Sequence, residues 1–330
     1  MAARTAFITG IAGFAGSYLA EQLLAAGYRV SGTLFPGEST TNLTDILDDI
    51  SLTELDILDA AGCRDALSTF KPHFIFHLAA LASVGNSFTN EQLTFRVNFE
   101  GTLNILQAAM KVRNLKRLVF VGSPDCFGIF RPKNKTLTED HPFNPVSPYG
   151  ISKAAADRIS LYYWRQHNLP VVVARPFNHS GPRQTEGFVI PDFARQVAAI
   201  EAGLKKPLIS VGDLTARRDL SDVRDIVRGY QLIAEKGRLG RTYHLCSGRA
   251  VAIETVLDSL LRFSSRKIKV TIDKSRLRKN EIPVLRGSNR RAVQELGFKP
   301  RYSLKTTLKD TLEYWRSKLP PAAAARTGGI

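Results

Sequence analysis

Two side chains four residues apart, Tyr149 and Lys153, have the types and spacing required for proton transfer. Four residues is about one turn of a helix, so both side chains would lie on the same helix face. An ammonium group there stabilises the phenolate and lowers the pKa of the tyrosine, which can then exchange a proton with a carbonyl or hydroxyl oxygen. Ser123, just past a predicted strand, could hydrogen-bond the same oxygen. The pair alone is a weak signal, because many helices contain this spacing.

A glycine-rich turn near the N-terminus has the spacing that a dinucleotide cofactor requires. Its three glycines follow a short apolar run and precede a helical pattern. Residues without Cβ let the backbone approach a pyrophosphate, and the free N–H groups at the start of the helix favour its negative charge. A plain tight turn between strand and helix is the alternative. The cofactor contacts predicted from this turn are Gly10, Gly13, Phe14, Ala15 and Gly16.

The end of the second predicted strand normally selects between NAD and NADP. An acidic residue there binds the ribose hydroxyls, whereas an arginine accommodates the additional phosphate. The segment Ser31–Pro36 contains neither, so the choice between the two cofactors stays open. Asp56 and Ile57 follow the third strand, where we expect the adenine ring. A helix N-cap is the alternative role for Asp56 or Asp59.

Short apolar runs alternate with helical segments, which indicates parallel strands connected by helices. We expect an α/β fold: a Rossmann-type, doubly wound parallel sheet with a smaller C-terminal α/β lobe for the substrate. Residues 1–175 would form the NAD(P)-binding domain, to which about 220–247 return; 176–318 would mainly form the substrate lobe, and 319–330 a disordered tail. The predicted strands are Thr5–Thr9, Tyr28–Thr33, Phe74–Leu78, Leu118–Val121, Val171–Ala174, Leu208–Val211 and Thr242–Leu245. The predicted helices are Ser17–Ala26, Ala60–Phe70, Phe95–Lys111, Phe193–Ala202, Asp222–Glu235, Ile253–Arg262 and Leu304–Trp315.

The composition indicates a large globular chain with a basic surface. The 330 residues are 44% hydrophobic and carry a net charge of +16, which attracts phosphates and other anions. No apolar run reaches the roughly 20 residues that span a bilayer, and the stretch before the first strand has no room for a secretory leader, so we expect a cytoplasmic protein. The three cysteines form no CxxC pair, and no metal site is expected. Nucleic-acid binding is the alternative explanation of the charge, but the basic residues are spread along the chain.

Taken together, these motifs resemble those of the extended short-chain dehydrogenase/reductase family. The resemblance covers about residues 4 to 316 and is carried by Gly10/Gly13/Gly16, Leu55-Asp56-Ile57, His77-Leu78-Ala79-Ala80, Asn98-Phe99-Glu100-Gly101-Thr102, Ser123 and Tyr149/Lys153. It implies catalysis by Ser123, Tyr149 and Lys153, and a homodimer formed through helices at about 91–111 and 152–167. It also implies NAD or NADP contacts from Asp56, Ile57, Leu78, Ala79, Ala80, Asn98, Tyr149 and Lys153.

Motifs in the second half narrow the resemblance to the branch that acts on GDP-linked sugars. They are Arg175–Gln184, Gly187–Phe193, Val211–Leu214, Arg218–Asp225 and Pro283–Asn289. Guanidinium groups suit such a substrate because they bind phosphates bidentately, although a surface salt bridge is the alternative for each arginine. Arg183, Arg217 and Arg224 are weaker candidates, expected to be structural or exposed. The implied substrate residues are Asn178, Phe188, Val189, Arg218, Arg278 and Glu281.

The residues after Ser123 help to distinguish a reductase from a dehydratase. The family's dehydratases usually carry a glutamate two residues after the serine as an additional base, whereas this chain has Asp125, one methylene shorter. Pro124 and Phe127 also depart from the usual pattern, and Asp125 has a turn or cap role as its alternative. We expect NAD(P)H-dependent reduction of a GDP-4-keto-6-deoxy sugar to a GDP-6-deoxyhexose of the GDP-rhamnose type. The alternatives are a GDP-mannose 4,6-dehydratase, a nucleotide-sugar 4-epimerase and a nucleic-acid-binding family member.

Overall fold

The fold is organised around one seven-stranded parallel sheet. The computed structural model describes residues 4–130, 136–273 and 282–320. The strands follow the order β10-β6-β5-β4-β1-β2-β3, and every neighbouring pair is parallel. Their apolar residues form nearly continuous runs, as in a sheet covered on both faces. The bounds are β1 Arg4–Thr9, β2 Tyr28–Leu34, β3 Ile50–Glu54, β4 Phe74–His77, β5 Arg117–Val121, β6 Val171–Pro176 and β10 Thr242–Leu245.

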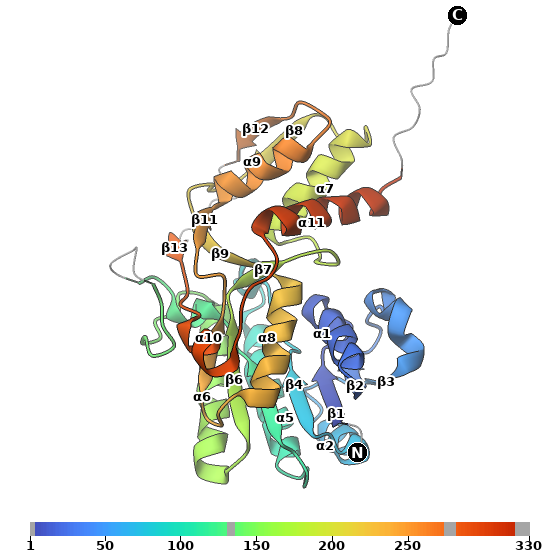
Figure 1. Cartoon of the computed structure of the whole chain (residues 1–330), viewed down its shortest axis with the longest axis vertical. Helices are drawn as coiled ribbons and strands as arrows, with labels where there is room; N and C mark the ends of the chain where they lie inside the picture. Colours follow the sequence, from blue (N-terminus) through green and yellow to red (C-terminus); the bar gives the residue numbers. More distant parts are fainter. Residues whose placement is uncertain (1–3, 131–135, 274–281, 321–330) are drawn as a thin grey trace, which may run out of the picture.

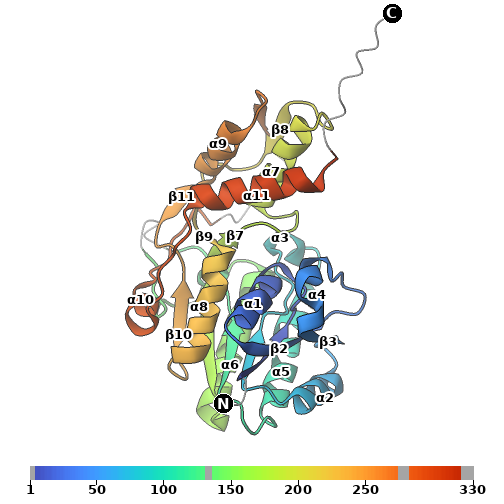
Figure 2. The ribbon, with the colours of Figure 1, turned by 45° about the vertical axis from the view of Figure 1, so that its right-hand side comes forward.

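Helices cover both faces of this sheet. Neighbouring strand residues point to opposite sides, so Ile8 of β1 packs into one core and Phe7 into the other. Figures 1 and 2 show α1 and α8 side by side over the first face. The expected doubly wound α/β fold is therefore confirmed. The first face carries α1 (Phe14–Ala25), α8 (Val223–Lys236) and α10 (Arg290–Leu296), and the second carries α2 (Ala60–Phe70), α5 (Gly101–Ala109) and α6 (Pro148–His167).

Another hydrophobic core lies in the C-terminal lobe, which Figure 1 shows beyond one end of the large sheet. The chain passes from β6 into β7 and from β10 into β11, so the lobe lies beyond the carboxyl ends of these strands. Its helices are α7 (Val189–Glu201), α9 (Ile253–Phe263) and α11 (Leu304–Lys318). Its strands are β7 (Asn178–Ser180), β8 (Leu208–Val211), β9 (Arg217–Asp222), β11 (Ala250–Ala252), β12 (Lys269–Ile272) and β13 (Val284–Leu285).

Several elements differ from the predicted ones. The predicted helix Phe95–Lys111 begins earlier, as α4 (Glu91–Phe95), and a π-helical turn η2 (Arg96–Glu100) joins it to α5. The short elements not predicted also include the 3-10 helices η1 (Thr41–Asp49) and η3 (Pro124–Phe127) and the helix α3 (Val84–Ser87). Within the described residues no helix is long and apolar enough to cross a membrane. The predicted tail at 319–330 lies largely outside the described residues.

Candidate active site

The glycine turn between β1 and α1 has the geometry that a pyrophosphate requires. Gly10 has a φ of +69°, and a Cβ at Gly16 would lie 2.2 Å from the carbonyl oxygen of Gly10. Gly13 is the N-cap of α1 and supplies no side-chain cap, and the first turn of α1 carries no acidic residue. The N–H groups of that turn have no acceptor within the helix and can bind an anion. These residues therefore fit a nicotinamide dinucleotide.

A hydrogen-bonded threonine fixes the end of β4 beneath this turn. The Thr9 hydroxyl oxygen accepts the N–H groups of Leu78 and Ala79, both at 3.1 Å, and lies 2.8 Å from His77 Nδ1. A Cβ on Gly10 would lie 3.1 Å from the Ala79 backbone, so the two segments are in close contact. Burial, followed by the charge of Lys153, lowers the pKa of His77 to about 3. The histidine is therefore neutral, and it orients Thr9, whose hydroxyl holds the predicted cofactor residues Leu78 and Ala79.

Asn98 lies in the π-helical turn η2, fully buried between two segments of the site. Its Oδ1 accepts the Leu81 N–H at 2.8 Å, and its Nδ2 donates to Leu81 O at 3.2 Å and Ser152 Oγ at 3.0 Å. The Thr102 hydroxyl donates to Asn98 O at 2.7 Å and lies 3.0 Å from His77 Nε2. Asn98 thus joins the segment after β4 to α6. Its predicted contact with the cofactor remains a prediction.

The predicted adenine-side residues have structural partners. Asp56 is half-buried and accepts the N–H of Leu58 at 2.9 Å, while Asp59 is the N-cap of α2. Ile57 is buried, and a Cβ on Gly101 would lie 2.5 Å from its Cδ1. The N-cap alternative therefore holds for Asp59. Adenine contacts from Asp56 and Ile57 remain predictions.

Ser123 and Tyr149 each lie at the start of a helix, Ser123 at the short η3 and Tyr149 at the long α6. Ser123 caps η3 directly after β5, and Ser147 caps α6 by accepting the Gly150 N–H at 3.0 Å. Pro148 occupies the first turn of α6, where its missing N–H has no cost, so Tyr149 lies at the beginning of the helix. Both side chains are more than nine-tenths buried.

The Tyr149 hydroxyl is held in its protonated form. Burial raises the pKa of Tyr149 most, the charge of Asp125 raises it further, and the hydroxyl of Ser123 acts in the opposite direction. These effects also show that the Ser123 and Asp125 side chains face the phenol. The expected lowering of the Tyr149 pKa is therefore wrong for this structure, because burial and a neighbouring carboxylate outweigh any ammonium.

Lys153 is directed at the end of β5. Its Nζ donates to Val121 O at 2.6 Å and lies 4.8 Å from the centre of the Phe120 ring. Burial lowers the pKa of Lys153 to about 8, although the charge of Asp157 raises it. The lysine is therefore an ammonium whose proton is held weakly near neutral pH.

Asp125 is hydrogen-bonded to Ser123, which lies two residues before it in the chain. The Ser123 hydroxyl donates to Asp125 Oδ2 at 3.1 Å, and the Asp125 N–H donates to Ser123 Oγ at 3.2 Å. The turn role considered for this segment is therefore present, with Ser123 as the cap. The carboxylate of Asp125 is therefore oriented toward Ser123.

The predicted substrate residues lie at the junction with the C-terminal lobe. Asn178 is exposed on β7, which pairs with β9, and Arg218 lies on β9 itself. Arg218 Nη1 donates to Ile282 O at 2.6 Å. Phe188 is the N-cap of α7, and Val189 is its exposed first residue. Arg278 and Glu281 lie outside the described residues.

The weaker arginine candidates have structural contacts. Arg183 binds Glu21 at 2.6 Å, and Arg224 binds both Asp222 and Asp310. Arg217 is exposed and donates to a backbone carbonyl. Sequence reasoning did not assign the threonine and histidine beneath the glycine turn. Their signal is a pair of polar residues at the carboxyl ends of two buried strands, β1 and β4.

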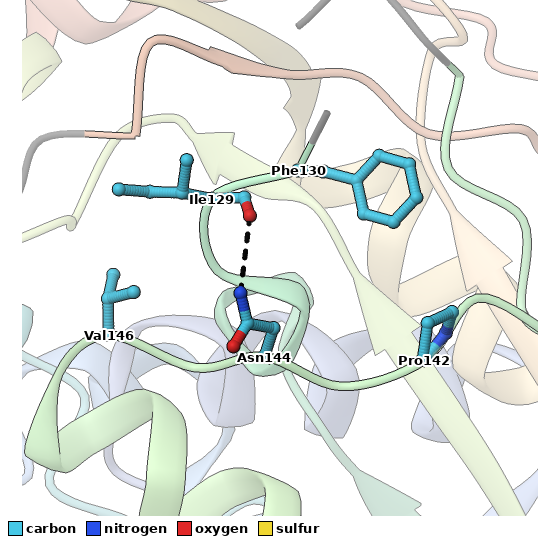
Figure 3. A pocket seen from close by; sticks show the side chains of 5 residues that line it. All are labelled: Ile129, Phe130, Pro142, Asn144 and Val146. Carbon is cyan, nitrogen blue, oxygen red and sulfur yellow. Dashed lines mark hydrogen bonds between the residues drawn. The ribbon is translucent and has the colours of Figure 1, made fainter. Parts of the chain in front are cut away.

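An apolar pocket of about 500 Å³ lies on the loop between η3 and α6 (Figure 3). Asn144 closes part of it by donating to Ile129 O at 3.4 Å. None of the predicted catalytic or substrate residues lines this pocket, so its location alone gives it no part in the chemistry. The lining residues are Ile129, Phe130, Pro142, Asn144 and Val146.

Comparison with known proteins agrees with this geometry. The profile of the family described as GDP-mannose 4,6 dehydratase matches residues 7–311. A GDP-6-deoxy-D-mannose reductase of Pseudomonas aeruginosa is 32% identical, over 95% of this chain and 97% of the relative. The solved structure of RMD from P. aeruginosa complexed with NADPH is 30% identical, with a TM-score of 0.82 over 96% of this chain and 100% of that one. A Thermus thermophilus UDP-glucose 4-epimerase in complex with NAD is 27% identical, with a TM-score of 0.84 over 96% of this chain and 100% of that one.

Proposed function

This chain belongs to the extended short-chain dehydrogenase/reductase family, in the branch described as GDP-mannose 4,6 dehydratase, and from that premise we propose that it reduces a GDP-4-keto-6-deoxy sugar to a GDP-6-deoxyhexose. The substrate class follows the reductase relative, whose name is GDP-6-deoxy-D-mannose reductase. The cofactor is a nicotinamide dinucleotide, NAD or NADP, as in the related structures.

The observation that carries this proposal is the protonated phenol beside a serine and a carboxylate. A reductase must deliver a proton to the C4 oxygen, and Tyr149, whose pKa is raised by burial, carries its proton near neutral pH. Asp125 is hydrogen-bonded to Ser123, which limits its reach as a separate base at C5. This arrangement favours reduction over dehydration.

Each catalytic side chain has one task in the proposed reaction. Tyr149 donates its hydroxyl proton to the C4 oxygen, and the Ser123 hydroxyl turns from Asp125 Oδ2 to donate a hydrogen bond to the same oxygen. Lys153 stabilises the negative charge that forms on Tyr149, from one helical turn away. When bound, the reduced cofactor supplies a hydride for C4. Arg218 on β9 and Asn178 on the neighbouring strand β7 bind the diphosphate or sugar.

Dehydration of GDP-mannose is the second candidate. It is supported by the family match and by the presence of an acid, Asp125, two residues after Ser123. This reaction removes the C5 proton and expels the C6 hydroxyl, so it needs a base that reaches the sugar independently of Ser123. Epimerisation at C4 is a third candidate, supported by the structural similarity to an epimerase.

A homodimer is part of the proposal. The two helical segments predicted to form it carry exposed apolar side chains, including Leu93, Phe95 and Met110 in the first and Tyr162 in the second. Contiguous exposed apolar groups mark surfaces that another chain covers. A cytoplasmic location remains a prediction.

Two parallel assays test the proposed reaction. One contains GDP-mannose with oxidised cofactor, and the other contains GDP-4-keto-6-deoxymannose with reduced cofactor, with products identified by NMR. We expect turnover only in the second. Tyr149→Phe should lower it on the order of 100-fold or more while cofactor binding persists, and Tyr314→Phe on the distant helix α11 is the matched control. A 4-keto-6-deoxy product in the first assay would favour dehydration, and normal turnover by Tyr149→Phe would remove it as the proton donor.

A further inference from the structure

A carboxylate, that of Glu38, lies at the end of β2, although the strand itself contains no acidic residue. The chain turns sharply after Leu34: the Glu38 N–H donates to Phe35 O at 2.8 Å, and Gly37 has a φ of +76°. Glu38 Oε2 then accepts the Phe35 N–H at 3.0 Å. The turn thus folds the acid back, so that its carboxylate lies at the first residue after the strand.

This carboxylate lies at the same edge of the sheet as the glycine turn, because β1 and β2 are parallel. β2 pairs with β1 along its whole length, and the Ile11 N–H donates to Thr33 O at 3.0 Å. Asn42, at the start of η1, donates from Nδ2 to Ala12 O at 3.1 Å. The glycine turn, the end of β2 and the start of η1 are therefore joined. In a dinucleotide-binding fold the adenosine ribose is bound at the end of this strand.

The segment that contains the end of β2 and η1 is negatively charged, whereas the whole protein is positively charged. No lysine, arginine or histidine occurs from Val30 to Cys63, although the chain has a net charge of +16. Arg29 lies before this stretch, with its guanidinium 5.2 Å from the centre of the Phe70 ring. The acids in the same stretch are Glu38, Asp45, Asp48, Asp49, Glu54, Asp56 and Asp59.

A 2′-phosphate is poorly suited to these surroundings. It carries close to two negative charges, and proteins that bind it supply an arginine near the end of the second strand. A free 2′-hydroxyl instead donates a hydrogen bond to a carboxylate. We propose that Glu38 makes this protein selective for NAD(H) over NADP(H), by accepting a hydrogen bond from the adenosine ribose and repelling a 2′-phosphate.

The selectivity is testable by cofactor binding alone. NADH and NADPH are titrated separately into the protein without sugar, with binding followed by nicotinamide fluorescence and by calorimetry. We expect NADH to bind at least about tenfold more tightly, because a carboxylate near a doubly charged phosphate is unfavourable even in water. Added salt should reduce the difference between the two affinities, because it screens the repulsion between the carboxylate and the 2′-phosphate.

Glu38→Gln is the decisive variant, because the amide oxygen can still accept the Phe35 N–H and the turn is preserved. We expect it to bring the two dissociation constants to within a few-fold of each other, mainly through tighter NADPH binding. Asp48→Asn, an exposed acid on η1, removes the same charge and should leave most of the preference in place. Equal affinities in the unmodified protein, or an unchanged ratio in Glu38→Gln, would overturn the inference.

The inference rests on the proposed function only in requiring a nicotinamide cofactor on the glycine turn. Because the titration contains no sugar, its result is independent of the reaction catalysed. Preference for NADH without sugar reduction would contradict only the proposed function. Sugar reduction with equal affinity for both cofactors would contradict only the role of Glu38.

Discussion

Replacing Lys153 with methionine should stabilise the folded protein near neutral pH. The lysine is about 5% exposed, and burial lowers its pKa from 10.5 to about 8. A base with a lowered pKa destabilises the fold below that pKa, because the folded chain must hold a charge that the unfolded chain holds freely. The destabilisation fades as pH rises from about 8 to 10.5, where the folded protein loses the proton first.

The size of this effect follows from the two pKa values. Their difference corresponds to about 3 kcal/mol of unfolding free energy below pH 8. Methionine is uncharged and of similar length, but it loses the hydrogen bond to Val121 O, which contributes about 2 kcal/mol because its donor is charged. We therefore expect Lys153→Met to be more stable by about 1 kcal/mol near neutral pH, and the advantage to disappear by about pH 10.

Urea unfolding at several pH values measures this difference directly, because the unfolding free energy extrapolates linearly to zero denaturant. The control is Lys309→Met, which removes an exposed ammonium on α11 and should follow the unmodified protein at each pH. Parallel stability curves for Lys153→Met and the unmodified protein between neutral and alkaline pH would refute the reasoning. The variant should also lose most of its turnover, since the charge beside Tyr149 is absent.

Two further substitutions test the packing around the site. Gly16→Ala places a Cβ 2.2 Å from the Gly10 carbonyl oxygen, so the turn must move. We expect a loss of about 1–3 kcal/mol in the free energy of unfolding and no increase in Tm when cofactor is added. An increase in Tm equal to that of the unmodified protein would contradict this expectation. Asp157→Asn leaves the buried guanidinium of Arg175, now bound bidentately at 2.7 and 2.9 Å, without its counter-charge; we expect a loss of about 3–5 kcal/mol in urea unfolding. The same change at the exposed Asp140 should have little effect, and similar losses in both variants would argue against a special role for burial.

The fold was predictable from the sequence because its main elements have strong local patterns. The buried strands contain continuous apolar runs such as Val171–Ala174, and helix starts are marked by residues such as Asp59 and Ser147 that cap them. The short strands of the C-terminal lobe lack such a pattern. For example, β9 reads Arg-Arg-Asp-Leu-Ser-Asp and is a strand only because β7, β11 and β13 pair with it.

The candidate site was predictable in its residue types but not in its electrostatics. The spacing of Tyr149 and Lys153 identified the pair, yet the pKa of Tyr149 depends on burial and on Asp125, which lies far from it in the sequence. The carboxylate of Glu38 was missed for a similar reason. It lies beyond the segment where an acid is expected and returns to the strand end through a turn.

The central claim, reduction at C4 of the sugar, is tested most directly by following a deuterium atom. The reduced cofactor is labelled at the transferable position and mixed with GDP-4-keto-6-deoxymannose, and the product is examined by NMR. The account predicts deuterium at C4 of a GDP-6-deoxyhexose, with one cofactor oxidised for each sugar, and loss of this transfer in Tyr149→Phe. If instead no deuterium reaches C4, and GDP-mannose in a parallel sample is dehydrated with its own C4 hydrogen recovered at C6 and no net oxidation of cofactor, reduction at C4 is contradicted and Asp125 becomes the base.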